Sequence, residues 1–325
     1  MLKNDYSPPV LPSLILDKAP VITAGTQIAW HVCRHDFQFN GGSMSHLKKI
    51  SALGFTAALL SMTGISQVLA QTSPAAAEPA TTVVTPGPLT ANITLTNDYR
   101  YRGISQSNFR PAIQGGFDYA HSSGFYIGNW NSSISWISDA ASTAGNNASA
   151  PIEMDFYGGF KYEWSKGFVA DVGVLQYYYP TTNLSAFAAN PNTTELYAAQ
   201  NFTFDALTGY LKFSWAATTL FGTANSSGSN YTDLTANYDT GFWGLSLNAH
   251  VGYQFVAGKV ADTGISNSSL YSYTDWKLGV TKDFGSGLSG SMAYIGTNAK
   301  DGSYVNPQLQ NLGKGGFLIS LTKTF

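Results

Sequence analysis

Apolar and polar residues alternate along most of the chain from residue 92 onward. In the segment 152–164 the even-numbered positions are mostly apolar or aromatic, whereas the odd-numbered positions carry Glu153, Asp155, Lys161 and Glu163. A period of two places successive side chains on opposite faces of an extended strand, so each such segment has one apolar and one polar face. Runs of this length exceed the roughly 5–6 residues of strands in soluble sheets and match the roughly 9–11 that a tilted strand needs to cross a bilayer.

Twelve segments with this pattern are predicted to be strands. The face assignment is ambiguous in the third of them, around Asn129–Ser133. Tight turns alternate with long loops rich in Asn, Ser and Gly, and one connection on the long-loop side, near 105–110, is predicted to be short. This arrangement is typical of an all-β fold, a transmembrane antiparallel up-and-down β-barrel with short periplasmic turns and long extracellular loops, whereas a soluble sandwich has no reason for it. The predicted strands are 92–104, 111–121, 124–137, 152–164, 168–178, 194–204, 209–218, 231–239, 242–255, 272–281, 287–296 and 316–325.

Charge is almost confined to the polar faces of these segments. On the apolar faces only Lys323, next to the chain end, is charged. Because a Lys or Arg on the lipid face costs about 2–4 kcal/mol near the midplane, a charge-free face indicates contact with lipid. It also explains why charged residues make up only 11% of a chain whose mean hydropathy is −0.06. The candidates for lining the lumen and setting ion selectivity are Asp98, Arg100, Arg102, Asp118, Glu153, Asp155, Lys161, Glu163, Asp171, Glu195, Lys212, Asp233, His250, Asp275 and Lys277.

Composition excludes several other classes of protein. Aromatic residues make up 14% of the chain, too many for a disordered protein. A formal charge of −2 does not suit a nucleic-acid partner. Residues after position 70 lack the run of about 18 apolar residues that a membrane helix needs.

The first ninety residues are expected to lie outside the barrel. Met44 begins a positively charged stretch that is followed by the apolar run 50–60 and by small residues up to Ala70, which is the pattern of a signal peptide. An anchor helix, the alternative, is disfavoured because polar residues interrupt the end of the apolar run. The predicted organisation is an over-extended N-terminus at 1–43, a signal peptide at 44–70, a Pro/Ala/Thr-rich periplasmic tail at 71–90 and the barrel at 91–325.

Three stretches resemble a known family. Residues 92–106, Asn-Ile-Thr-Leu-Thr-Asn-Asp-Tyr-Arg-Tyr-Arg-Gly-Ile-Ser-Gln, are similar to the opening strand of the TorF-type porins of the Gcw_chp group, and the match continues through 111–120 and 123–130. Residues 316–325 resemble the family's closing strand. The resemblance implies a location in the outer membrane of a Gram-negative bacterium and a role in transport, with no known substrate and no catalytic residues.

The chain end also resembles the signal that the barrel assembly machinery reads. That signal is a terminal strand with apolar alternate positions and a final Phe. Lys323 stands where an aromatic residue is often found. The residues of the predicted signal are Phe317, Ile319, Leu321 and Phe325.

The predicted function is passive diffusion of small hydrophilic solutes through a narrow, charged lumen. Twelve strands lie between the roughly eight of filled barrels and the 16–18 of open porins. Asp98, Arg100 and Arg102 alternate, which places them on one face about 7 Å apart in a strand. The two arginines would either bind anionic solutes or, as we favour, pair with Glu153, Asp155 or Glu163. Acidic candidates outnumber basic ones nine to five, which favours cations weakly.

Two other functions stay open. An outer-membrane lipid hydrolase needs a Ser nucleophile and a His base, and His250 shares a face with Ser246 and Asn248, whereas His121 lies at a predicted turn. A closed structural or adhesin barrel would act through its long loops. We expect no metal and no cofactor, because residues 71–325 contain two His and no Cys and show no phosphate-binding loop.

Overall fold

The computed structural model describes residues 88–142, 147–182 and 189–325. The predicted N-terminal extension, the predicted signal peptide and the predicted tail up to residue 87 lie outside these residues.

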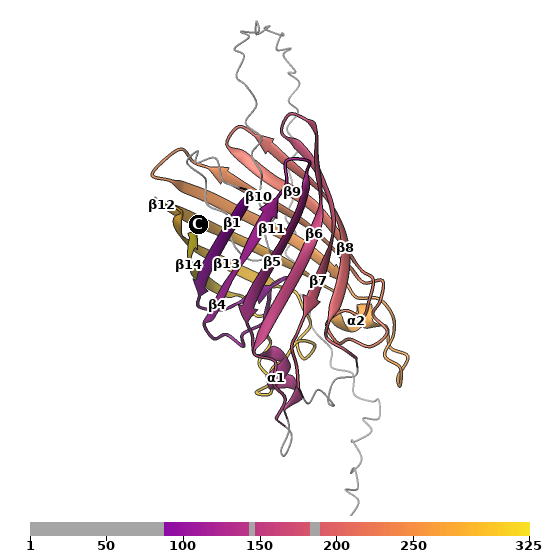
Figure 1. The fold of residues 1–325 in the computed structure, drawn as a ribbon. Helices are drawn as coiled ribbons and strands as arrows, with labels where there is room; N and C mark the ends of the chain where they lie inside the picture. Colours follow the sequence, from indigo (N-terminus) through magenta and orange to yellow (C-terminus); the bar gives the residue numbers. More distant parts are fainter. Residues whose placement is uncertain (1–87, 143–146, 183–188) are drawn as a thin grey trace, which may run out of the picture. The chain divides into compact units, whose positions relative to one another are not determined.

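The described residues form a closed antiparallel barrel of twelve strands in sequence order (Figure 1). Each wall strand pairs with its neighbours along the chain, and the first pairs with the last, so the predicted all-β up-and-down barrel is confirmed. The wall strands are β1 (Leu89–Thr96), β4 (Ala112–Ala120), β5 (Phe125–Ser133), β6 (Ile152–Ser165), β7 (Phe168–Tyr178), β8 (Thr193–Phe204), β9 (Leu207–Ala216), β10 (Asn230–Asp239), β11 (Leu245–Phe255), β12 (Tyr273–Gly285), β13 (Leu288–Thr297) and β14 (Gly316–Thr324).

The largest error of the sequence prediction concerns the first strand. The wall strand β1 ends at Thr96, and residues 97–104, predicted to continue it, leave the wall. They contain two short strands that pair only with each other, β2 (Arg100–Tyr101) and β3 (Ile104–Ser105). The connection from β1 to β4 therefore spans 97–111, and the prediction of a short connection near 105–110 was wrong.

Most other strand boundaries also differ from the prediction by a few residues. The third predicted strand, 124–137, ends at Ser133, and helix α1 (Trp136–Ala141) follows it. β1 begins at Leu89, which pairs with Tyr119, so the predicted tail at 71–90 extends too far. β12 continues to Gly285 instead of ending at 281. A second short helix, α2 (Asn267–Tyr271), lies in the loop between β11 and β12.

The barrel has one rim of tight turns and one rim of long loops. The connections β6–β7, β8–β9 and β12–β13 are two residues long, and the ends of β1 and β14 lie at the same rim, where Ala91 and Phe325 exchange backbone hydrogen bonds. The long connections, including both helices, lie at the opposite rim. The predicted alternation of short and long connections is therefore present, with the single correction above.

The outer face of the wall is an apolar belt between two sets of aromatic residues. Aliphatic side chains such as Leu95, Leu278 and Ile319 are 56%, 67% and 58% exposed in its middle. Toward the short-turn rim the exposed aromatic residues include Tyr119, Phe125, Tyr162, Trp164, Phe204, Tyr238, Phe242, Trp243, Phe284 and Phe325. Toward the loops they are Tyr178, Trp215, Tyr253, Trp276, Tyr294 and Phe317.

Two charged residues occupy outward positions of the described wall strands, and both are lysines. Lys323 lies between the exposed Leu321 and Phe325, as predicted. Lys282 lies beyond the predicted end of its strand, but the longer β12 places it between the outward residues Val280 and Phe284. Both lysines are close to the short-turn rim. Among the described residues, no helix is long and apolar enough to cross a membrane.

Candidate functional site

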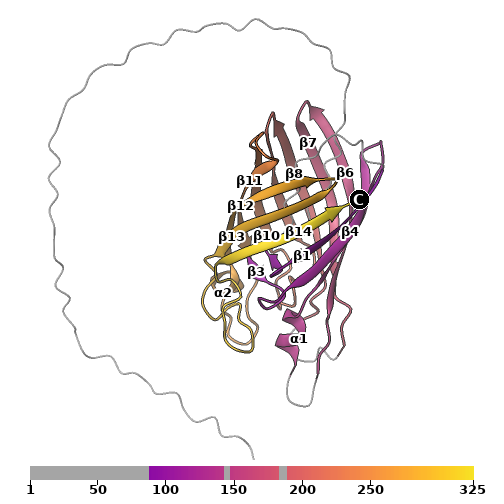
Figure 2. The ribbon, with the colours of Figure 1, turned by 90° about the vertical axis from the view of Figure 1, so that its left-hand side faces the viewer.

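The connection 97–111, which we call the inner segment, folds into the lumen of the barrel through its residues 98–107. Every residue from Asp98 to Ser107 is buried. β2 and β3 form a small hairpin within it, and β3 is visible behind the wall strands in Figure 2. The hairpin turn consists of Arg102 and Gly103, with φ of 46° and 78°. Positive φ at both central positions is the geometry of a type I′ turn, whose twist matches that of paired strands.

Arg102, at the tip of this hairpin, reaches across the lumen to the opposite wall. Its Nη2 donates to both carboxylate oxygens of Glu195 on β8, at 2.9 and 2.7 Å, and its Nη1 donates to Oε1 of Gln254 on β11 at 2.6 Å. Its guanidinium lies 4.2 Å from the ring centroid of Tyr231 on β10. Arg102 and Glu195 are both buried. A bidentate buried pair of this kind fixes position as well as adding energy, and removing one partner typically costs about 3–5 kcal/mol.

Tyrosines attach the rest of the hairpin to β6 and β7. Tyr101 and Tyr177 share a hydrogen bond of 2.5 Å between their hydroxyls. Tyr99 donates to Glu153 at 2.5 Å, and Tyr179 donates to the other oxygen of the same carboxylate at 2.8 Å. Burial, reinforced by the Glu153 carboxylate, raises the pKa of Tyr99 and of Tyr179 well above the ordinary value. Both hydroxyls therefore stay protonated and act as donors at neutral pH.

Arg100 attaches the base of the hairpin to the loop between β13 and β14. Its Nε donates to Asp98 at 2.5 Å, and its Nη1 donates to the carbonyls of Gly103, Leu312 and Lys314 at 2.9, 3.2 and 2.9 Å. The second oxygen of Asp98 accepts hydrogen bonds from two serines of the inner segment. The inner segment thus makes polar contacts on several sides of the lumen and constricts it.

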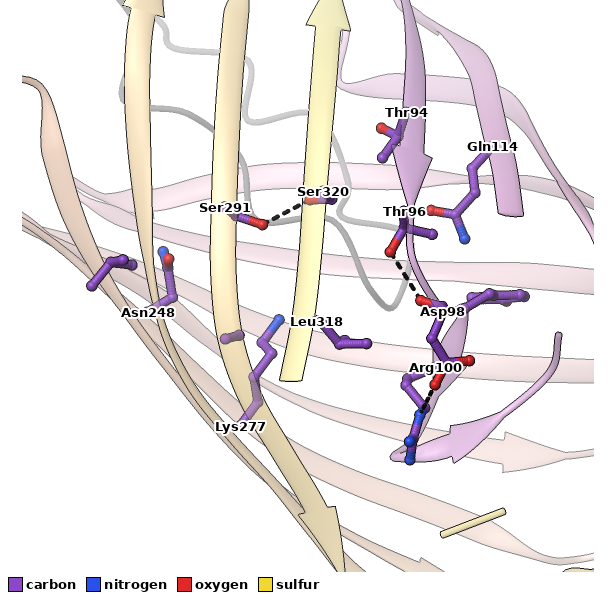
Figure 3. Close-up of a pocket in the computed structure, with 13 residues that line it drawn as sticks. Thr94, Thr96, Asp98, Arg100, Gln114, Asn248, Lys277, Ser291, Leu318 and Ser320 are labelled. Atoms are coloured by element: carbon purple, nitrogen blue, oxygen red, sulfur yellow. Dashed lines mark hydrogen bonds and ion pairs between the residues drawn. The ribbon is translucent and has the colours of Figure 1, made fainter. Parts of the chain in front are cut away.

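A small cavity lies between the inner segment and the wall strands around it (Figure 3). Its volume is about 30 Å³, which is room for about two water molecules. In Figure 3 the side chain of Lys277 extends from the wall toward this space. No ion pair within the described residues includes Lys277. The cavity is lined by Thr94, Thr96, Asp98, Tyr99, Arg100, Gln114, Asn248, Lys277, Val280, Ser291, Ala293, Leu318 and Ser320.

The arginine constellation predicted from the sequence is arranged differently in the structure. Asp98, Arg100 and Arg102 are not spaced along one face of a wall strand, because the chain has already turned inward. Both arginines do pair with carboxylates, Arg100 with Asp98 and Arg102 with Glu195. The predicted partners Glu153, Asp155 and Glu163 were wrong. A sequence pattern cannot show which wall strand a hairpin tip will meet across a lumen.

The other predicted lumen residues belong to the wall and alternate with the exposed outer residues. Asp118 accepts a hydrogen bond from Tyr157, and Asp171 accepts one from Tyr126, both at 2.6 Å. Glu163 is exposed at the short-turn rim. The predicted lumen residues at inward positions deeper in the barrel are Asp118, Glu153, Asp155, Lys161, Asp171, Glu195, Lys212, Asp233, His250, Asp275 and Lys277.

The sequence prediction missed the luminal tyrosines. They lie on the polar faces of their strands, in several cases an even number of residues away from a charged residue such as Glu153, Glu195 or Asp233. This spacing could have identified them as luminal. Glycines on neighbouring strands make room for their rings: a Cβ at Gly252 would overlap the ring of Tyr231. The luminal tyrosines with such a glycine are Tyr126, Tyr157, Tyr197 and Tyr231, which lie against Gly159, Gly128, Gly173 and Gly252.

His250 belongs to the same luminal network. Its Nδ1 lies 2.9 Å from Oγ1 of Thr235, and its Nε2 lies 3.0 Å from the Tyr231 hydroxyl and 3.1 Å from Oδ2 of Asp275. Both ring nitrogens are therefore engaged with residues other than Ser246, the serine that the sequence pattern placed on the same face.

The protein is a transmembrane β-barrel: the barrel is closed, its outer belt carries no charge over the described residues except two lysines near the short-turn rim, and a segment folds into its lumen. Residues 77–325 match the family described as "Bacterial protein of unknown function (Gcw_chp)". The chain belongs to the Gcw_chp family, and the resemblance noted in the sequence is confirmed at that level. The TorF label is not part of the family's description and stays a prediction.

Solved structures with a similar fold are porins, at low similarity. A "KdgM porin" is 6% identical, with a TM-score of 0.43, over 73% of this chain and 98% of its own. A "NanC porin" is 10% identical, with a TM-score of 0.45, over 72% and 98%. The "outer membrane protein OprD from Pseudomonas aeruginosa" is 12% identical, with a TM-score of 0.35, over 69% and 61%. No curated protein matches the sequence.

Replacing Gly252 by Val should loosen the inner segment. The added side chain displaces Tyr231, which donates to Asp275 at 2.7 and 2.8 Å and supports the Arg102 guanidinium. We expect the free energy of unfolding in detergent to fall by about 1–3 kcal/mol, with faster proteolysis inside residues 97–111. Ala249→Val, on the outer face of the same strand, is the control. An equal loss in the two variants would contradict this account.

Proposed function

We propose that this protein is an outer-membrane channel of a Gram-negative bacterium that passes small hydrophilic solutes, with the inner segment as its constriction. The observation that carries the proposal is the division of the wall into two faces. Outward positions of the described wall strands are mostly apolar and carry no charge except for lysines near one rim, although Asn131, Gln176 and Gln200 also lie on the outward face, whereas inward positions are rich in hydroxyl, amide and charged groups. A barrel can bury its strands in lipid only if the outer face is apolar, and a polar lumen suits hydrated solutes.

The proposed orientation places the short turns in the periplasm and the long loops outside the cell. The two sets of exposed aromatic residues would then lie at the two membrane interfaces, where rings with polar atoms are favoured. The chain end supports assembly by the barrel assembly machinery, because Phe317, Ile319, Leu321 and Phe325 all face outward and are 65%, 58%, 47% and 71% exposed.

A closed barrel that acts through its loops is the second candidate, and the burial of the inner segment favours it. Every residue from Asp98 to Ser107 is buried inside the lumen, where this segment narrows the space open to a solute. The two candidates therefore differ in whether the inner segment can move aside. A lipid hydrolase is less well supported, because His250 lies in the lumen, on the inward face of β11, and its ring nitrogens contact Thr235, Tyr231 and Asp275.

Arg102→Ala should increase the conductance of the refolded barrel in planar bilayers. Loss of the contacts to Glu195, Gln254 and Tyr231 frees the hairpin tip, so we expect a severalfold larger mean conductance or longer openings. Lys300→Ala, in the loop between β13 and β14, is the matched control. If both the native chain and Arg102→Ala stay silent in bilayers while folded, the closed-barrel candidate holds instead.

Lys277→Glu should shift ion selectivity toward cations. Two cations, Arg100 and Lys277, line the cavity. Arg100 is paired with Asp98, whereas Lys277 is in none of the ion pairs of the described residues. We expect the reversal potential under a salt gradient to move in the cation-selective direction relative to the native chain. Lys300→Glu makes the same charge change outside the lumen and should leave it nearly unaltered. Identical potentials for the native chain and Lys277→Glu would exclude a selectivity role for this side chain.

Leu278→Lys should destabilise the barrel in the bilayer. Leu278 is 67% exposed at the middle of β12, and a lysine at the bilayer midplane costs about 2–4 kcal/mol. Urea unfolding in phospholipid vesicles measures this cost. Ser291→Lys, on the inward face of β13, is the control and should lose much less. Equal losses would mean that the outer belt does not face lipid.

A further inference from the structure

We propose that Lys282 and Lys323 form a patch that binds the phosphate groups of anionic phospholipids on the outer face of the barrel at its short-turn rim. The inference rests on the proposed membrane location, but not on conduction. Its starting point is that these lysines are the charged residues at outward positions of the described wall strands. Ammonium groups in an otherwise apolar belt are stable only where a headgroup or water can reach them.

The two lysines lie on the strands on either side of β13. Lys282 lies on β12 opposite Gly290 of β13, and Lys323 lies on β14 opposite Leu288 of β13. Because neighbouring strands are about 4.8 Å apart, β12 and β14 are separated by about 10 Å across β13. A Cβ at Gly290 would lie 3.1 Å from the ring of Phe284, so this ring covers the wall between the lysines.

Both ammonium groups point toward the rim and contact backbone carbonyls at its turns. Lys282 Nζ donates to the carbonyl of Trp243, and Lys323 Nζ donates to the carbonyl of Ser286. The Lys323 ammonium also lies 5.5 Å from the ring centroid of Phe325. This places two cations and their aromatic neighbours at the depth where phospholipid headgroups meet the acyl chains.

The site has an excess of positive charge. The ion pairs of the described residues do not include either lysine. Asp283, next to Lys282 in sequence, alternates to the inward side of β12, where it pairs with the buried Ser289. Both ammonium groups therefore keep their charge available to an anion from outside the chain. A lipid phosphate is favoured over a free one because Phe284 and Phe325 are 59% and 71% exposed beside the lysines and offer a surface for acyl chains.

The test compares which lipids stay bound to the protein. The full-length protein is inserted into bilayers of phosphatidylcholine mixed with phosphatidylglycerol, released, and examined by native mass spectrometry for retained lipid. We expect preferential retention of phosphatidylglycerol, reduced about fivefold for each lysine replaced, in Lys282→Gln, Lys323→Gln and the double variant. The control is Lys300→Gln with Lys314→Gln, which removes the same charge from the loops of the opposite rim.

Two further measurements make the outcome decisive. Heat-modifiable gel migration reports whether each variant is folded, and raised salt should weaken the preference of the native chain because exposed charges are screened. Equal retention of the two lipids by the native chain, or an unchanged preference in the folded double variant, overturns the site. Displacement by inorganic phosphate alone, at a concentration comparable with the lipid, would assign the site to free phosphate and overturn the lipid. A native chain that never enters bilayers refutes the proposed membrane location as well.

Discussion

The backbone pairing of β1 with β14 closes the sheet, and the rest of the structure depends on that closure. An open sheet leaves a row of unpaired N–H and C=O groups at each edge, which no structure buried in lipid tolerates. Here Asn92 to Thr96 pair with Thr324 to Ser320 in antiparallel register, so every wall strand has two neighbours. Closure also gives alternate side chains two different environments, and this explains why a period of two recurs in the wall strands.

The same junction releases the inner segment. β1 pairs only with the part of β14 from Ser320 to Thr324, because the chain turns inward after Thr96. The side chain of Asn97 forms hydrogen bonds with the part of the β14 backbone that β1 leaves unpaired. Its Nδ2 donates to the carbonyl of Phe317 at 3.1 Å, and its Oδ1 accepts from the amide of Ile319 at 2.8 Å. The backbone amide of Asn97 donates to the carbonyl of Ile319 at 3.1 Å. One side chain therefore completes the wall where the segment departs from it.

The wall could be predicted from the sequence, whereas the inner segment could not. Each wall strand can be recognised from its own residues, because alternation within the strand fixes the face of each side chain. Leu278 faces outward and Lys277 inward regardless of which strands lie elsewhere in the barrel. Tyr99 to Arg102 continue the same alternation of aromatic and charged residues, but here the alternation does not separate a lipid face from a lumen face. The local indication of the turn was Gly103 after Arg102. The partners of Arg102, Glu195 and Gln254, are set by contacts across the lumen that no local pattern contains.

The contacts that hold the inner segment can be strong in the closed state and still be compatible with movement. Removing the Arg102 side chain leaves the Glu195 carboxylate buried without its partner, and that desolvation accounts for most of the cost of such a mutation. Displacing the whole segment is different, because water would enter the space it leaves and solvate both charges. The cost of opening is then the difference between the ion pair and two hydrated charges, which is far smaller than the cost of removing one partner. A constriction held by ion pairs and tyrosine hydroxyls is therefore better suited to reversible displacement than one packed with aliphatic side chains, which would gain nothing from water.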